Sequence, residues 1–236
     1  MILIRAGRVL GPTEGLDIKA DVVLDGDRIA GIFPADQGGA EGAPGFSTRA
    51  RQYEQIIEAE GLPAAPGLVD VPVPFRDPGP TYTEDIHTGA RAAAKGGITT
   101  VVCMANTNPI VDNEETLRYV LEEGRKTGIH VLSCAAVSKG FAGRELTDME
   151  GLLAAGAAGF TDDGIPLMEG TFVREAMEEA ARLDTVLSFH EEAKHFIREN
   201  GINHGRISDE LGIYGSPALA ADYLVARDCM IALCTG

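Results

Sequence analysis

The stretch APGLVDVPVPFRDPG, residues 65–79, decides the fold of this chain. It opens on a Pro66-Gly67 break, continues as the apolar run 68–73 and ends at a second break, Pro78-Gly79. After it, short apolar runs alternate with longer segments of helical periodicity, a pattern typical of βα units and a parallel sheet. The residues from 65 onward therefore predict an α/β fold.

This alternation supplies five strand candidates and the helices between them. In the helix predicted at 114–126, Leu117, Val120 and Leu121 form an apolar stripe at i, i+3 and i+4. A closed TIM barrel needs eight strands and about 250 residues, so we expect a partial (β/α)8 barrel. The last strand of such an open barrel would have an unpaired edge. Either the chain is truncated, or a second copy of it covers that edge. The predicted strands are 68–73, 99–104, 130–134, 158–161 and 186–190, and the predicted helices are 84–95, 114–126, 148–154, 172–183 and 217–233.

A smaller unit is predicted before the quoted stretch. Short apolar runs separated by glycine-containing turns fill residues 2–32, and Asp25-Gly26 between two of these runs is a hairpin signal. Residues 36–51 combine glycine and charge with almost no apolar periodicity, which predicts a flexible loop near 36–53. The predicted domains are a small antiparallel β-sheet domain at 1–64 and an incomplete barrel at 65–236.

Composition and charge exclude several classes of function. The 236 residues are 44% hydrophobic, as in a folded soluble protein, and a formal charge of -16 repels nucleic acid and anionic membranes. No apolar run approaches the roughly 20 residues of a membrane span, and the N-terminus lacks a signal-peptide core, so we expect a cytoplasmic protein. Without CxxC spacing, the four cysteines are expected to be reduced, buried thiols. They are Cys103, Cys134, Cys229 and Cys234.

Four motifs follow one another in order along the predicted barrel. They are APGLVDVPVPFRDPG at 65–79, MANTNP at 104–109, GFTDDG at 159–164 and SFHEE at 188–192. In this order they resemble the dihydroorotases of the amidohydrolase superfamily, bacterial type with an aspartate metal bridge. The resemblance implies a barrel with one or two zinc ions at the carboxyl ends of its strands. It also implies the reversible cyclisation of N-carbamoyl-L-aspartate to (S)-dihydroorotate in de novo pyrimidine synthesis.

The first motif departs from the family pattern at two positions. The family ends its first barrel strand with His-x-His, whose i and i+2 side chains both reach one metal. Pro72 and Pro74 occupy those positions here, and a proline nitrogen within a peptide bond cannot ligate. Each proline also removes a backbone donor from a strand. A strand end that tolerates proline and a sequence error are alternatives, but two changes beside an intact Arg76-Asp77 favour lost or removed ligands.

Arg76 and Asn106 are the candidate substrate-binding residues. The resemblance implies that they hold the substrate carboxylate, for which the forked guanidinium is well suited. An ion pair of Arg76 with Asp77 or another nearby acid explains Arg76 equally well if the metal site is lost. Asn106-Thr107-Asn108-Pro109 taken alone is a turn after a strand.

Asp163 and His190 are the candidate metal ligands. The resemblance implies that Asp163 ligates and can bridge metals, that Asp162 points away, and that His190 ligates from the next strand. On the residues alone, Asp-Asp-Gly is a common turn, and a histidine closing a strand is more often packed or hydrogen-bonded. Two protein ligands are fewer than the three of a catalytic zinc site, so we expect the chain to bind zinc weakly or not at all.

No catalytic residue is expected to be retained, because the family's proton-transfer aspartate and a further histidine ligand would follow residue 236. The four remaining histidines match no family ligand and are given no role. They are His87, His130, His195 and His204.

Two kinds of function remain open. One is a dihydroorotase that takes N-carbamoyl-L-aspartate or dihydroorotate as its small-molecule substrate. The other is an inactive homologue, a pseudoenzyme, that acts as a homo-oligomer or as the structural partner of an active dihydroorotase or of aspartate transcarbamoylase. A hydantoinase or allantoinase resembles the lysine-bridged branch, and Asp162-Asp163-Gly164 argues against it. Neither nucleic acid nor a membrane is expected as a partner.

Overall fold

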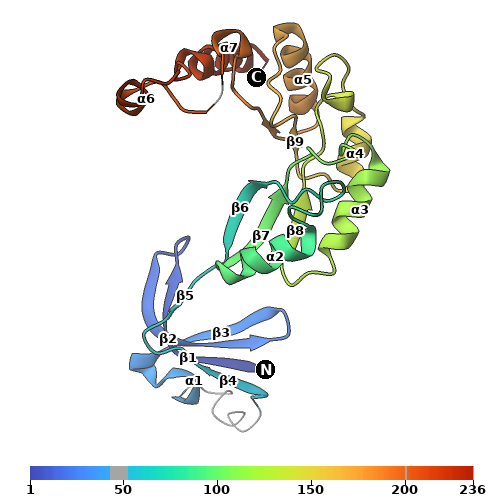
Figure 1. Cartoon of the computed structure of the whole chain (residues 1–236). Coiled ribbons are helices and arrows are strands. Elements are labelled where there is room, and N and C mark those ends of the chain that lie inside the picture. Colours follow the sequence, from blue (N-terminus) through green and yellow to red (C-terminus); the bar gives the residue numbers. More distant parts are fainter. Residues whose placement is uncertain (43–52, 200, 236) are drawn as a thin grey trace. The chain divides into compact units, whose positions relative to one another are not determined.

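The computed structural model describes residues 1–42, 53–199 and 201–235 (Figure 1). The chain divides into two compact units, Met1–Gly67 and Leu68–Gly236. The division falls directly after the Pro66-Gly67 break of the quoted stretch. We propose that each unit is a domain, and we describe each by itself.

The first unit is a mixed β-sheet in the order β3-β2-β1-β4, with β5 also paired to β1. The predicted antiparallel pairing is present between β1 and β2 and between β2 and β3. The strands β4 and β5, which the sequence did not predict, run parallel to β1. The predicted hairpin is present: Asp25 pairs with Arg28 across a two-residue turn whose Gly26 has a φ of 60°. The strands are β1 (Ile2–Gly11), β2 (Leu16–Asp25), β3 (Arg28–Pro34), β4 (Gln55–Glu58) and β5 (Pro63–Ala64).

The segment predicted as a flexible loop begins with helical turns instead. A 3-10 turn, η1 (Ala35–Gln37), and α1 (Gly39–Gly42) follow β3. The Asp21 carboxylate accepts a 3.0 Å hydrogen bond from the Ala40 amide and so ties α1 to β2. The rest of the predicted loop, 43–52, lies outside the described residues.

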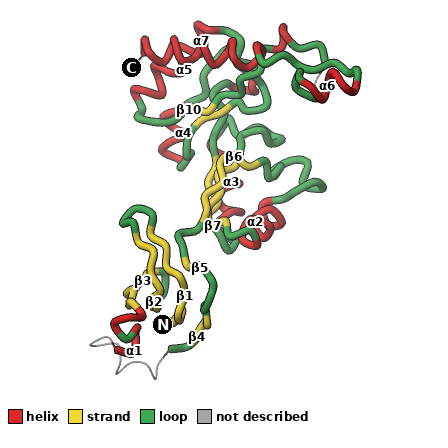
Figure 2. Tube along the Cα trace, turned by 90° about the vertical axis from the view of Figure 1, so that its left-hand side faces the viewer, coloured by secondary structure: helices red, strands yellow, loops and turns green. Residues whose placement is uncertain are grey.

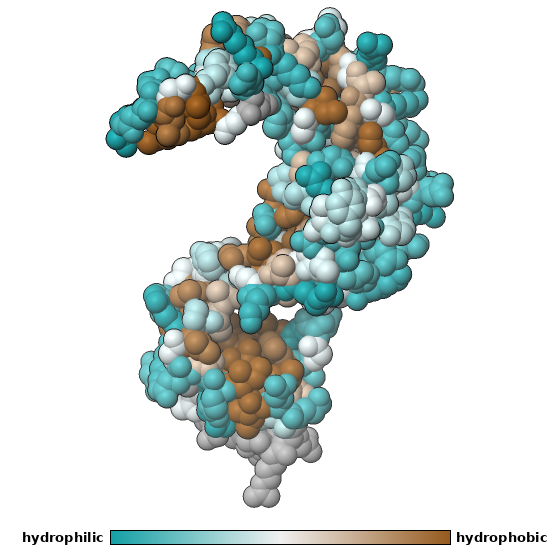
Figure 3. All heavy atoms as spheres, viewed as in Figure 1, coloured by the Kyte–Doolittle hydropathy of each residue, from teal (hydrophilic) through white to brown (hydrophobic). Residues whose placement is uncertain are grey.

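An apolar cavity of about 860 Å³ lies in the first unit, among residues of the sheet and of the segment that follows it. Figure 3 shows apolar side chains gathered over this unit. The large side chains that line it include Ile4, Val9, Leu24, Ile32, Ile57 and Leu62.

The second unit is built on parallel strands that lie in chain order. β6, β7 and β8 form one sheet and β9 pairs with β10, while a parallel bridge from Ala135 to Phe160 connects β8 to β9. The order agrees with a partial (β/α) barrel, so the predicted fold class is confirmed (Figures 1 and 2). The strands are β6 (Leu68–Val73), β7 (Ile98–Cys103), β8 (His130–Ser133), β9 (Phe160–Thr161) and β10 (Leu187–Ser188).

Helices follow the strands, and side-chain caps fix where several of them begin. Asp85 accepts a hydrogen bond from the Thr88 amide (2.7 Å), and Asn113 accepts one from the Thr116 amide (3.0 Å). Such caps satisfy amides that have no partner within the helix. The helices are α2 (Ile86–Lys95), α3 (Glu114–Gly124), α4 (Met149–Ala155), α5 (Gly170–Arg182), α6 (Arg206–Leu211) and α7 (Leu219–Thr235), with 3-10 turns η2 (Lys139–Phe141) and η3 (Lys194–Phe196).

The core of the second unit lies between the sheet and these helices. Leu117 and Val120 of the predicted α3 stripe are buried there, and Leu121 packs against their cluster. The cysteine prediction holds for Cys103 and Cys134, which are buried, but it is wrong for Cys229 and Cys234, which are exposed on α7.

A bulge in β6 accommodates one of the two prolines. Asp70 pairs with Val101 and Val73 with Cys103, so three steps along β6 match two steps along β7. Pro72 lies within this irregularity. Because a bulge leaves a residue unpaired, the amide hydrogen that proline lacks is not needed there.

No helix of the residues that the structure describes is long and apolar enough to cross a membrane.

Candidate functional site

The candidate residues follow the carboxyl ends of the parallel strands. Arg76 comes after β6, Asn106 after β7, Asp163 after β9 and His190 after β10. Parallel strands bring these ends to one edge of the sheet, where barrel sites form.

Asp163 and His190 are in direct contact. The Nδ1 atom of His190 lies 2.9 Å from Oδ1 of Asp163, and its Nε2 atom lies 3.5 Å from Oε2 of Glu192. The Gly164 amide donates to the same Asp163 oxygen at 2.9 Å. The imidazole is therefore placed between two carboxylates, and all three side chains remain partly accessible to solvent.

Asp162 points away from Asp163, as the resemblance implied. It is 2% exposed. Its Oδ1 accepts hydrogen bonds from the amides of Val137 (2.7 Å) and Ser138 (3.1 Å), and its Oδ2 accepts one from the Ser138 hydroxyl. Burial raises the pKa of Asp162, while these hydrogen bonds oppose the rise. The residue joins the end of β9 to the loop after β8 and so fixes the backbone next to Asp163.

Asn106 lies beside the Asp163 loop. A β-carbon built on Gly164 would lie 3.9 Å from Nδ2 of Asn106. The Oδ1 atom of Asn106 is buried and has no hydrogen-bond partner within the described part of the chain. Because buried acceptors are nearly always paired, this oxygen is a candidate to accept a donor from a ligand.

Arg76 is exposed and forms no ion pair with any residue that the structure describes. The alternative that Asp77 pairs with Arg76 is wrong here. The Asp77 carboxylate is buried and accepts from the Tyr119 hydroxyl (3.0 Å) and the Ile86 amide (3.4 Å) instead. Among the described contacts, none joins the Arg76 guanidinium to Asn106, Asp163 or His190.

Pro72 and Pro74 lie on the same side of the strand end. Val73 and Phe75 are buried in the core, whereas Pro72 is half-buried and Pro74 is exposed, as is Arg76. This alternation directs residues 72, 74 and 76 away from the core. The two positions where the family has histidines thus provide no ligand atoms.

The donor set does not fit a complete zinc site. Asp163 and His190 provide one carboxylate and one imidazole, and the prolines add none. Within 1–42, 53–199 and 201–235, no group of three or more His, Cys, Asp or Glu side chains has a geometry that could hold a metal ion. A catalytic zinc usually has three protein ligands, so these residues alone fall short.

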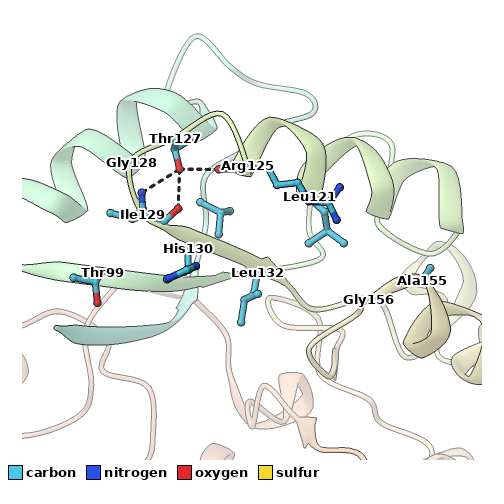
Figure 4. Close-up of a pocket in the computed structure, with 12 residues that line it drawn as sticks. Thr99, Leu121, Arg125, Thr127, Gly128, Ile129, His130, Leu132, Ala155 and Gly156 are labelled. Atoms are coloured by element: carbon cyan, nitrogen blue, oxygen red, sulfur yellow. Dashed lines mark hydrogen bonds between the residues drawn. The ribbon is translucent and has the colours of Figure 1, made fainter. Parts of the chain in front are cut away.

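A cavity of about 640 Å³ adjoins His190. Its polar lining includes Glu191, Glu192 and His204 from the segment between β10 and α7, and Asp222 of α7. A second cavity of about 640 Å³ lies at the amino ends of β7 and β8, where Thr99 and His130 line it (Figure 4). Because it is at the opposite end of the strands, it does not belong to the candidate site.

Glu191 and Asp228 form a carboxyl pair that the sequence did not predict. Burial, with the nearby Asp228 carboxyl adding to it, raises the pKa of Glu191 to about 7. Asp228 also pairs with Arg227, which donates to the carbonyls of Leu167 (2.8 Å) and Met168 (2.9 Å). The pair links the segment after β10 to α7 across a long sequence separation, and no spacing motif signals such a contact.

Comparison with known proteins identifies relatives of the whole chain. Residues 63–236 match the family model described as dihydro-orotase-like. A dihydroorotase from Clostridioides difficile is 50% identical over 236 residues, covering 100% of this chain and 53% of its own length. One from Streptococcus thermophilus is 46% identical over 233 residues, covering 98% of this chain and 52% of its own. The chain thus spans about half the length of the curated relatives it matches.

A solved structure shares the fold. The L-hydantoinase (dihydropyrimidinase) from Arthrobacter aurescens superposes with a TM-score of 0.74 over 100% of this chain and 51% of its own, at 18% identity. At that identity the likeness concerns the fold alone.

Proposed function

Because this chain belongs to the dihydroorotase-like family, we propose that it carries a dihydroorotase-type site that binds the carboxylate ligand but lacks metal-dependent turnover. The ligands would be N-carbamoyl-L-aspartate or (S)-dihydroorotate, which the family interconverts in pyrimidine synthesis. The family resemblance implies zinc for that reaction. The chain as written would be inactive.

One observation carries this proposal: the strand end that should provide two imidazoles carries Pro72 and Pro74, while Asp163 and His190 are in contact. The 2.9 Å contact between Asp163 and His190 supports retention of the opposite half. With only two donors in place, the residues do not fit a catalytic zinc ion, and we derive no reaction step that uses one.

Ligand binding would rest on Arg76 and Asn106. Arg76 has no ion pair within the described residues, so its guanidinium is available to donate two parallel hydrogen bonds to a carboxylate. The unpaired Oδ1 of Asn106 would accept a ring or carbamoyl N–H of the same ligand. Hydrogen bonds to charged groups contribute about 1.5–3 kcal/mol each, enough for binding without turnover.

A second candidate is a structural or assembly partner without ligand. The exposed apolar side chains of β6 favour it, since Leu68, Val69 and Val71 are 61%, 63% and 58% exposed. Such side chains are usually covered in a parallel sheet. An active dihydroorotase, aspartate transcarbamoylase or a second copy of this chain would be the partner.

The test is ligand binding measured together with turnover. We expect purified chain to bind (S)-dihydroorotate by titration calorimetry and to show no hydrolysis of it with zinc present. Arg76→Ala should weaken the binding by more than tenfold while leaving it measurable, whereas Arg91→Ala, on the outer surface of α2, should leave it unchanged. Turnover by the unaltered chain would contradict the inactive assignment. Absence of any binding would favour the assembly role.

A further inference from the structure

Arg76 has a backbone conformation that its own side chain disfavours. Its φ is 59°, in the left-handed region that residues with a β-carbon rarely adopt. Such a conformation persists only where the surroundings impose it. The residues on either side of Arg76 therefore need anchors, and both have one.

Phe75 anchors the amino side of Arg76. Phe75 is buried, and a β-carbon built on Gly89 of α2 would lie 2.4 Å from its ring. The aromatic ring therefore packs directly on helix backbone, which is possible only because residue 89 has no side chain. This contact fixes residue 75 against α2.

Asp77 anchors the carboxyl side of Arg76 to two helices. Its Oδ2 accepts from the Ile86 amide in the first turn of α2 (3.4 Å), and its Oδ1 accepts from the Tyr119 hydroxyl of α3 (3.0 Å). Burial and the Asp77 carboxylate raise the pKa of Tyr119 to about 12, so the hydroxyl remains a donor at neutral pH. Tyr119 thereby holds the side chain next to Arg76 from the opposite helix.

The same loop is docked against the segment that carries Asn106. The Asn108 amide donates to the Pro78 carbonyl at 2.8 Å, and a β-carbon on Gly79 would lie 3.0 Å from the Asn108 backbone nitrogen. A shift of Asp77 would therefore change the position of Arg76 relative to Asn106.

We propose that Tyr119, acting through Asp77, is a positioning residue that holds Arg76 in its left-handed conformation for a ligand carboxylate. The ligand part of this inference rests on the proposed function. Tyr119 lies on a helix outside the candidate site and touches no ligand itself. A positioning role for Tyr119 differs from a general stabilising contact, because loss of its hydroxyl should weaken ligand binding only when Arg76 is present.

The first arm of the test is binding of (S)-dihydroorotate to the full chain. Tyr119→Phe retains the ring and removes only the hydroxyl, and we expect it to weaken binding about tenfold. Tyr82→Phe is the matched control, because Tyr82 is 89% exposed. In an Arg76→Ala background the Tyr119→Phe change should have no further effect. An equal loss in both backgrounds would overturn the proposal.

The second arm needs no ligand. The backbone chemical shifts and amide coupling constant of Arg76, measured by NMR, report its φ. We expect left-handed values in the unaltered chain and in Tyr82→Phe, and a shift toward extended values in Tyr119→Phe. Unchanged Arg76 values in Tyr119→Phe would overturn the positioning role. If the unaltered chain binds no dihydroorotate, the proposed function fails, and this arm still decides the role of Tyr119.

Discussion

The end of β6 differs from the ends of β9 and β10 in what its candidate residues provide. After β9 and β10, the candidate ligands Asp163 and His190 are in contact at 2.9 Å. At β6 the ligand positions are occupied by Pro72 and Pro74, yet the loop that follows keeps its anchors to α2 and α3. This difference leads us to propose that the ligand set and the scaffold that positions it are separable.

Both regions have a buried aspartate directly next to a candidate site residue in the sequence. Asp162 adjoins Asp163 and is satisfied by two amides and a hydroxyl. Asp77 adjoins Arg76 and is satisfied by one amide and a tyrosine hydroxyl. In each pair the buried member orders the backbone, while its neighbour remains accessible to solvent, Asp163 in part and Arg76 more fully.

The largest expected effect comes from breaking the anchor at β9. Asp162→Ala leaves two buried amides and the Ser138 hydroxyl without their acceptor, so we expect a loss of about 3 kcal/mol in the free energy of unfolding. Urea denaturation followed by circular dichroism measures it. Asp163→Ala is the control, with an expected loss of about 1 kcal/mol or less, because Asp163 is only partly buried. Equal losses would contradict the division of roles.

A smaller loss of stability is expected when the anchor of the loop after β6 is disturbed. Gly89→Ala places a β-carbon 2.4 Å from the Phe75 ring, and overpacking of this kind costs about 1–3 kcal/mol. Because Phe75 adjoins Arg76, dihydroorotate binding should fall as well. Gly128→Ala is the matched control, since its β-carbon meets nothing within 4 Å. A stable Gly89→Ala variant with unaltered binding would show that Phe75 does not position Arg76.

The smallest effect concerns reactivity rather than stability. Burial raises the pKa of Cys103 to about 12 and that of Cys134 to about 11, so few thiolates form at pH 8 and both thiols are shielded. The exposed Cys229 and Cys234 on α7 should alkylate first. Mass spectrometry after brief iodoacetamide treatment measures the order. As the pH rises toward 11, more thiolate should form at Cys134 than at Cys103. Early labelling of Cys103 would mean that the sheet opens near β7.

The sequence predicted those parts of the fold that depend on local periodicity. The β6 prediction matches the strand residue for residue, and Leu117 and Val120 of the α3 stripe are buried with Leu121 packed against them, because both patterns repeat within one element. The strands predicted at 158–161 and 186–190 shorten to two residues each, since pairing between strands, and not apolar character, limits them. Cys229 and Cys234 were misjudged because burial of α7 depends on what it packs against.

The sequence motifs named candidate site residues, but they carried no information on the contacts that come from packing. The contact between Asp163 and His190 joins two residues that the family resemblance had singled out. The left-handed backbone of Arg76 and the link from Tyr119 to Asp77 have no sequence signal, because they arise from packing between α2, α3 and the loop after β6. The carboxyl pair of Glu191 and Asp228 was missed for the same reason.

Our central claim is that the metal ligands can be lost while the scaffold that positions them is kept. Its most direct test is the zinc content of the chain after both prolines are replaced. Pro72→His with Pro74→His would add two imidazoles to Asp163 and His190, enough donors for one roughly tetrahedral zinc. We expect elemental analysis after dialysis to find far less than one zinc per unaltered chain and close to one per double variant. The gain should disappear when His190→Ala is added. Stoichiometric zinc in the unaltered chain, or none in the double variant, would contradict the account.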